Sequence, residues 1–233
     1  MAEAAVRLAD TVWRIPTLRW DLLNSFALVG DDGSVTLVDC GLPHSSPRLV
    51  AGLAAMGKAP QDVTRIVLTH AHEDHAGGAA AAAKLTGAGV SVHEGDAIDL
   101  REGTTPPLDQ SVWLGRLASR RPQWITPVEV AEVLTDGQLL PVAGGLRVIH
   151  TPGHTPGHLA LLHEPTRVLI TGDSIFNVLG LRWPVKAFCT DFRMNERTAH
   201  QLGELEYDLA AFTHGAEIRD NARERVRKFV RAA

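Results

Sequence analysis

The chain contains little cysteine and few aromatic residues. Of its 233 residues only two are cysteines, Cys40 and Cys189, and one is a tyrosine. Two cysteines do not make a disulfide framework, so we expect a cytoplasmic protein in which both thiols are inert packing residues. No stretch is long and apolar enough to span a bilayer, and the N-terminus lacks the apolar core of a signal peptide.

An excess of positive charge is also lacking. The chain has 23 Lys and Arg against 27 Asp and Glu, a formal net charge of −4 at pH 7. This balance gives no electrostatic footprint for nucleic acid, and no basic amphipathic stretch suggests a helix on a membrane surface. We therefore expect a small-molecule substrate, with neither nucleic acid nor membrane as a partner.

What the chain does have is enough apolar sequence for a sizeable core, 45% of its residues. Apolar periodicity predicts strands over 12–15, 25–29, 35–38, 65–68, 90–93, 130–134, 138–142, 146–150, 159–162, 168–171 and 208–212. It predicts helices over 45–57, 76–85, 96–101, 195–205 and 217–230. This order favours a single α/β domain over 1–233, a sheet sandwich with helices outside.

Two irregular segments interrupt the predicted layers. Residues 103–127 and 174–191 carry prolines and large apolar side chains but no regular periodicity. We interpret both as excursions that cover the sides of a cleft. An exposed apolar excursion is also compatible with a homodimer.

The most informative segment is the run from Thr69 to Gly78. Between His70 and His75 it places three imidazoles and two carboxylates in six positions, directly after an apolar stretch. Such donors suit a divalent transition metal. The stretch before them predicts a buried strand, so the donors would lie at its carboxyl end, where open α/β layers place their chemistry.

More candidate ligands follow other apolar strands. His154 lies in a turn built by Pro and Gly, Asp173 follows 168–171, and His214 follows 208–212. Taken singly, each has an ordinary explanation as a turn histidine, a helix N-cap or a strand-end histidine. Together with the run, these make more donors than one zinc ion needs, which favours two ions.

Together these motifs resemble the metallo-β-lactamase superfamily of metallohydrolases over nearly the whole chain. The matching features are His70-Ala71-His72-Glu73-Asp74-His75, the turn at His154, Asp173 after Thr171-Gly172, and His214 before Gly215. The resemblance implies an αββα four-layer sandwich with metals at one edge between the sheets. It implies one ion held by His70, His72 and His154, and a second by Asp74, His75 and His214.

The resemblance further implies that Asp173 bridges the ions together with a hydroxide that attacks the substrate. Asp74 would also be catalytic, orienting the hydroxide or carrying its proton to the leaving group. Two zinc ions are expected, with iron or manganese as alternatives. Asp39 more readily orients a ligand histidine than binds metal, and His158 is expected to hydrogen-bond locally.

Within the superfamily, we expect the chain to be closer to lactonase-like and glyoxalase II-like members than to true β-lactamases. It nevertheless departs from each of these branches in at least one feature. True β-lactamases of this fold lack the aspartate corresponding to Asp173, and the secreted ones begin with signal peptides. Glyoxalase II continues into a helical glutathione-binding domain, whereas only 19 residues follow His214 here. Known lactonases place a tyrosine near the substrate carbonyl, but Tyr207 lies at the start of a predicted buried strand.

The expected activity is hydrolysis of a small, apolar ester, thioester or lactone. Large apolar residues in the cleft-side loops would form the substrate walls: Trp20, Leu22, Leu23, Trp113, Trp124, Phe176, Val178, Leu179, Leu181, Trp183 and Phe188. Arg182 and Lys186 would instead suit a carboxylate. The alternatives are an iron-dependent persulfide dioxygenase, a β-lactam hydrolase and a non-catalytic metal-binding protein.

Overall fold

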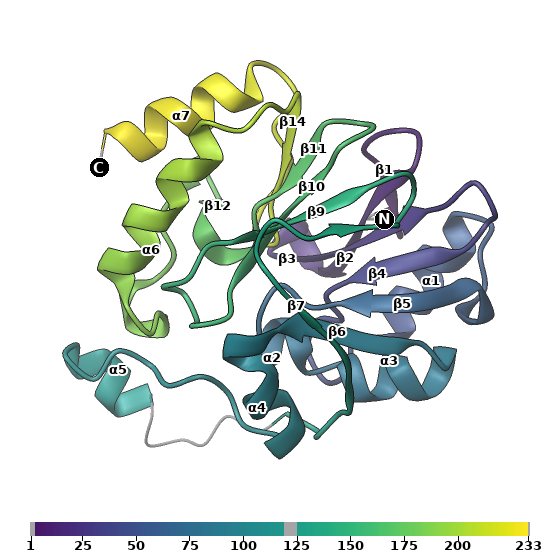
Figure 1. The fold of residues 1–233 in the computed structure, drawn as a ribbon, viewed down its shortest axis with the longest axis horizontal. Helices are drawn as coiled ribbons and strands as arrows, with labels where there is room; N and C mark the ends of the chain where they lie inside the picture. Colours follow the sequence, from purple (N-terminus) through teal and green to yellow (C-terminus); the bar gives the residue numbers. More distant parts are fainter. Residues whose placement is uncertain (1–2, 119–124, 233) are drawn as a thin grey trace.

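A computed structural model describes residues 3–118 and 125–232. Its elements form four layers, with helices on the outer face of each of two central sheets (Figure 1). This confirms the predicted αββα sandwich. The helices are α1 (Ser46–Ala55), α2 (Glu73–Ala76), α3 (Ala79–Thr86), α4 (Glu94–Glu102), α5 (Trp113–Ala118), α6 (Phe192–Ala199) and α7 (Ala222–Arg231). Short 3-10 turns are η1 (Arg19–Asp21), η2 (Pro60–Asp62), η3 (Gly172–Ser174), η4 (Lys186–Phe188) and η5 (His200–Gly203).

The first sheet has seven strands in chain order: β1 (Val6–Arg7), β2 (Val12–Leu18), β3 (Leu23–Val29), β4 (Val35–Val38), β5 (Val63–Val67), β6 (Gly89–His93) and β7 (Val130–Leu134). Strands β1 to β4 pair antiparallel, and β4 to β7 pair parallel. Parallel strands end at the same edge of a sheet. The segments after β4 and β5, with Asp39 and the histidine run, therefore lie side by side.

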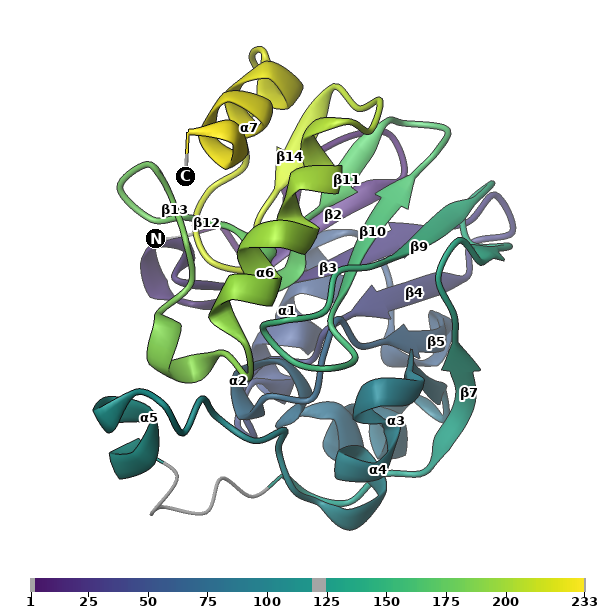
Figure 2. The same cartoon turned by 60° about the vertical axis from the view of Figure 1, so that its left-hand side comes forward.

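The second sheet has the order β14-β11-β10-β9-β8. Its strands are β8 (Leu139–Leu140), β9 (Leu146–His150), β10 (Leu159–His163), β11 (Val168–Ile170) and β14 (Leu209–Ala211). Strands β11 and β14 pair parallel, so the segments that follow them also meet at one edge. Figure 2 shows this sheet behind α6, with β12 (Phe176–Asn177) and β13 (Leu181–Arg182) forming a separate hairpin on the left.

Three groups of buried apolar side chains hold the layers together. The central group, between the sheets, includes Phe26, Val67, Val148 and Ile170. A second group packs α1, α3 and α4 on the first sheet, and a third packs α6 and α7 on the second. Each sheet is thus covered on both faces, which explains why many strands are continuously apolar.

The helix predicted over 76–85 is wrong in its boundaries. The chain forms α2 and then α3, with Gly77 and Gly78 between them. A Cβ at Gly78 would lie 2.3 Å from the Cys40 carbonyl oxygen. The close approach of these two backbones requires glycine, and it fixes the histidine run against the segment after β4.

The C-terminal helices also begin at other residues than predicted. Helix α6 begins at Phe192 because the Asp191 carboxylate accepts a hydrogen bond from the Met194 N–H and caps it. Helix α7 begins only at Ala222, since Ile218 forms a β-bridge with Ala210 and Glu217 pairs with Arg14.

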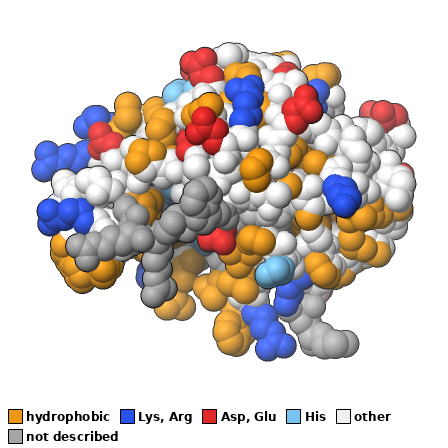
Figure 3. Space-filling model, turned by 90° about the horizontal axis from the view of Figure 1, so that it is seen from below, with side chains coloured by type: hydrophobic (Ala, Val, Ile, Leu, Met, Phe, Trp, Pro, Cys, Tyr) orange, Lys and Arg blue, Asp and Glu red, His pale blue; other side chains and the backbone are white. Residues whose placement is uncertain are grey.

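The two excursions contain α5, η4 and the β12–β13 hairpin. In Figure 2 all three lie on the left side of the molecule. The expectation for Trp124 falls outside the described residues. Seen from below, the side on which α5 lies carries exposed hydrophobic side chains (Figure 3). None of the helices in the described part of the chain is long and apolar enough to cross a bilayer.

Candidate metal centre

The structure brings all seven predicted ligands to one edge between the two sheets. The first sheet supplies His70 and His72 from the segment after β5, and Asp74 and His75 from α2. The second supplies His154 from the β9–β10 turn, Asp173 from η3 and His214 from the segment after β14. Five of the seven residues are buried, and the other two, Asp74 and His214, are partly exposed.

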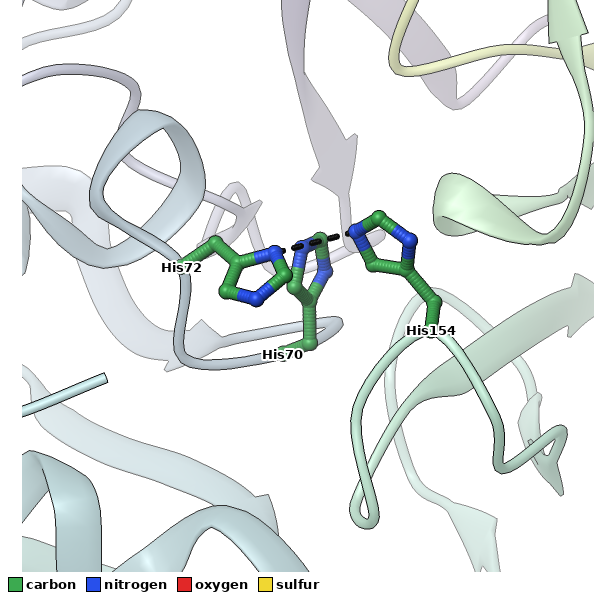
Figure 4. Close-up of side chains that lie close together, drawn as sticks. All are labelled: His70, His72 and His154. Carbon is green, nitrogen blue, oxygen red and sulfur yellow. Dashed lines mark hydrogen bonds between the residues drawn. The ribbon is translucent and has the colours of Figure 1, made fainter. Parts of the chain in front are cut away.

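One group of donors comprises His70, His72 and His154 (Figure 4). Nδ1 of His72 lies 3.0 Å from Nε2 of His154. Nε2 of His70 is buried and has no hydrogen-bond partner among the described residues. A buried ring nitrogen without a partner is costly unless it binds something, so this group is suited to a cation.

A second group comprises Asp74, His75 and His214. Nε2 of His75 lies 3.3 Å from Nε2 of His214, and Oδ2 of Asp74 lies 3.5 and 3.4 Å from these two nitrogens. Asp173 stands between the groups. Its Oδ2 is 3.2 Å from Nε2 of His154 and 3.3 Å from Nε2 of His214.

These separations match the donor spacing that metal coordination requires. Zinc–ligand bonds of about 2.0–2.1 Å in a tetrahedron place the ligand atoms about 3.3–3.4 Å apart. The separations just given run from 3.0 to 3.5 Å. The donor set of imidazoles and carboxylates is also one that binds divalent transition metals. The residues therefore fit a metal ion, and Asp173 reaches donors of both groups.

Burial keeps part of the site in the form that metal binding needs. It lowers the pKa of His70 well below its ordinary value and that of His72 to about 3. Neighbouring imidazoles act in the same direction. Both rings are therefore neutral at pH 7, and a neutral imidazole has a lone pair to donate.

At the second group of donors, the carboxylates favour positive charge. Burial alone would lower the pKa of His214, but Asp173 and Asp74 outweigh it and raise the pKa to about 10. The pKa of His75 is likewise raised against burial, by Asp173, Asp74 and Asp39. Divalent cations supply positive charge at such a point without protonating the ligands.

Asp39 orients two of the predicted ligands, as expected for at least one. Its Oδ2 accepts hydrogen bonds from Nδ1 of His75 at 2.9 Å and from the Thr69 hydroxyl at 2.8 Å. Since that hydroxyl donates to Asp39, its oxygen accepts from Nδ1 of His70 at 3.0 Å. This arrangement leaves Nε2 of both histidines facing the centre.

Other predicted ligands are held by partners that the sequence did not reveal. The Leu22 carbonyl accepts from Nδ1 of His214 at 2.6 Å. Sγ of Cys189, expected only to pack, lies 3.5 Å from Nδ1 of His154. His158 bonds locally to Thr151, as predicted, and its Nε2 accepts from the Asp173 N–H at 2.7 Å. The backbone carbonyl and the thiol leave no sequence signal that could have identified them.

A cavity of about 350 Å³ lies over the site. Its polar side is formed by His72, Glu73, Asp74, His154, Asp173 and His214. Its apolar side is formed by Leu108, Phe176, Val185 and Phe188. Phe176 also packs on His214, with ring centroids 4.4 Å apart. The apolar wall comes from both excursions, as predicted.

Only part of the predicted wall lines this cavity. Phe176 and Phe188 do, whereas Leu108 and Val185 were not predicted. The lining does not include Trp20, Leu22, Leu23, Trp113, Val178, Leu179, Leu181, Trp183, Arg182 or Lys186. Trp183 instead packs on Phe229 of α7, with ring centroids 4.8 Å apart. Tyr207 is buried in the third core group, away from the cavity.

Comparison with known proteins agrees with this geometry. The model of the metallo-β-lactamase superfamily matches residues 18–229. The chain belongs to the metallo-β-lactamase superfamily. The uncharacterized protein YobT of Bacillus subtilis is 31% identical over 96% of both chains. The probable metallo-hydrolase YybB of the same organism is 27% identical over 90% of this chain and 85% of its own.

Superfamily members also include longer relatives and solved structures. A hydroxyacylglutathione hydrolase of Anaeromyxobacter dehalogenans is 35% identical over 66% of this chain but only 46% of its own length. The crystal structure of a metallo-β-lactamase family protein from Thermus thermophilus is 27% identical, with a TM-score of 0.75 over 97% of this chain and 80% of that one. The superfamily assignment and the fold predicted from the sequence are confirmed.

Proposed function

We propose that this protein is a dinuclear metal-dependent hydrolase of small, apolar esters, thioesters or lactones. One observation carries the proposal: seven donors from both sheets converge at one edge, and five of them line a cavity whose lining also includes four apolar side chains. The superfamily membership and the metallo-hydrolase name of one relative support the hydrolytic class.

The residues of the site have two tasks in this proposal: seven of them hold ions, and one of these, Asp74, also moves a proton. His70, His72 and His154 would hold one ion, Asp74, His75 and His214 the other, and Asp173 both. When bound, the ions would activate water and polarise the scissile carbonyl. The Asp74 side chain is 39% exposed and lines the cavity, so it also reaches the substrate side. There its carboxylate orients water and carries a proton to the leaving group.

The cavity lining favours a neutral substrate. Its described residues include Glu73, Asp74 and Asp173 but neither Lys nor Arg. Substrate carboxylates are commonly bound by such cations, often bidentately by Arg. Glutathione thioesters and β-lactams carry carboxylates, so this lining favours neither. A neutral acyl group would instead pack on Phe176, Phe188 and Leu108.

A hydrolysis panel tests the proposal. Protein purified without added metal is assayed for metal content and against p-nitrophenyl esters, lactones, acyl thioesters and β-lactams. We expect about two zinc ions per chain and hydrolysis of neutral acyl substrates. One iron per chain with oxygen uptake on a persulfide contradicts the proposal and identifies a dioxygenase. Turnover confined to β-lactams also contradicts it.

A single variant tests the role of Asp74 in turnover. Asp74→Asn keeps the volume of the side chain but removes its charge and its capacity to accept a proton. We expect kcat to fall by about 10²–10⁴-fold, the usual contribution of general acid–base catalysis. A variant that hydrolyses the best substrate as fast as the wild type refutes the role of Asp74. Glu73→Gln, on the neighbouring cavity-lining residue, is the matched control.

A further inference from the structure

Asp96 is a buried carboxylate that the proposed chemistry does not use. It lies in the first turn of α4 and is 0% exposed. Burial raises its pKa to about 6, although hydrogen bonds from Thr155, Ala71 and Gly157 act in the opposite direction. It forms no ion pair with any described residue.

The three donors to Asp96 come from two segments, one after β5 and the other in the β9–β10 turn. Oδ2 accepts from the N–H of Ala71 at 2.9 Å and from the Thr155 hydroxyl at 2.7 Å. Oδ1 accepts from the N–H of Gly157 at 2.6 Å. Ala71 lies between His70 and His72, and Thr155 directly follows His154. One side chain therefore joins the two segments that carry the first group of ligands.

The backbone around Asp96 is shaped for this contact. A Cβ at Gly157 would lie 2.6 Å from the Asp96 nitrogen, and one at Gly95 would lie 2.8 Å from the Gly157 nitrogen. The β9–β10 turn thus sits directly on the start of α4, with no room for a side chain between them. Helix α4 belongs to the first half of the fold and the turn to the second, so this contact crosses the sandwich edge.

We propose that Asp96 is a positioning residue that ties the His70–His72 segment to the His154 turn and so fixes the spacing of the first ion's ligands. This inference rests on the metal site of the proposed function. The two segments belong to different sheets, and a main-chain hydrogen bond from the Leu159 N–H to the Thr69 carbonyl also joins them, at the start of β10. Without the Asp96 tie, the turn that carries His154 is held less firmly against the His70–His72 segment. His72 and His154, now 3.0 Å apart, would then share an ion less tightly.

The position requires a group that only accepts hydrogen bonds. All three neighbours donate, and an ionised carboxylate offers only acceptors. An asparagine has the same shape but turns an NH₂ group toward at least one of these donors. Asp96→Asn therefore removes at least one bond and leaves a buried donor unpaired.

The test compares Asp96→Asn with Asp99→Asn, a matched control three residues along the same helix. Asp99 is half-buried and accepts a hydrogen bond from the Thr104 hydroxyl, which lies just after the same helix and in no metal segment. For each protein the zinc dissociation constants are measured by chelator competition, and the metal-free protein is unfolded with urea. Thr155→Val and Thr155→Ser form a second pair, which removes or keeps a single hydroxyl donor to Asp96.

We expect Asp96→Asn to raise the dissociation constant of one zinc ion by 10–100-fold, the usual effect of losing a residue that orients ligands. The other ion should keep its affinity. Asp99→Asn should leave both constants within twofold. Thr155→Val should weaken the same ion as Asp96→Asn, and Thr155→Ser should restore it.

Three results overturn the inference in different ways. If Asp96→Asn unfolds more easily than the wild type but keeps both zinc constants, Asp96 is only structural, and the proposed function stands. If the wild type itself binds no zinc or other divalent metal, the proposed function fails together with the inference. Should Asp96→Asn fail to fold, the Thr155 pair decides, and equal zinc affinity in both Thr155 variants overturns the inference.

Discussion

Phe188 offers the sharpest test of the apolar cavity wall. It lies at the end of η4, lines the cavity and is 41% exposed. Burying a whole Phe side chain is worth about 1.5–3 kcal/mol. An acyl chain that covers the exposed 41% would gain about 0.6–1.2 kcal/mol, which corresponds to about a three- to eightfold change in kcat/KM. Phe188→Ala should lose this factor on long acyl chains.

The assay measures kcat/KM of both proteins on p-nitrophenyl acetate and p-nitrophenyl octanoate. We expect the octanoate chain to reach the wall and the acetate not to, and therefore a three- to eightfold loss on octanoate and little change on acetate. Leu139→Ala, at a 55% exposed position on β8 outside the cavity lining, is the control. An equal loss on both esters, or no loss on octanoate, refutes the reasoning about the wall.

Three further predictions concern the ligands and their supports. Asp39→Asn should weaken zinc binding by 10–100-fold and lower the free energy of unfolding by about 1–3 kcal/mol, because it places an NH₂ group among donors from Thr69 and His75. Zinc affinity equal to that of the wild type, measured by chelator competition, would contradict this. His214→Ala should reduce zinc from two ions to one per chain by elemental analysis, since the first group of histidines stays intact; two retained ions would exclude its role. Cys189→Ala should cost about 1 kcal/mol in urea unfolding, because the thiol is buried and contacts His154; a cost above about 4 kcal/mol would mean that the thiol does more than pack.

The location of the site could be predicted from the sequence because short apolar runs indicate strands, and the candidate ligands come directly after them. The segments with His70, Asp173 and His214 each come directly after a short apolar run, and parallel strands bring such ends to one edge. Asp39 was readable in the same way, since it follows β4, the neighbour of β5 in the sheet.

The supports of the site are not readable in this way. Asp96 accepts hydrogen bonds from Ala71 and Gly157, which lie 25 and 61 positions away in the sequence. The Leu22 carbonyl accepts one from His214, which lies 192 positions away. No local pattern marks such contacts, because they depend on how the two halves pack. Leu108 and Val185 lie in segments without periodicity, so their direction toward the cavity has no signature in the sequence.

Helix boundaries failed for a related reason. Periodicity runs on from α2 into α3, but the approach of Gly78 to the Cys40 backbone divides the two helices. Likewise the charged pattern of α7 extends back to Glu217, while Ile218 is taken by its β-bridge to Ala210. In both places a contact from the other part of the chain overrides the local preference.

Anomalous diffraction at the zinc edge from crystals grown with zinc tests the central claim most directly. We expect two peaks about 3.5–4 Å apart, the usual spacing in two-metal sites. The first peak should lie among His70, His72 and His154, the second among Asp74, His75 and His214, and Asp173 should contact both. A single peak, or peaks away from these residues, would contradict a dinuclear centre in this protein.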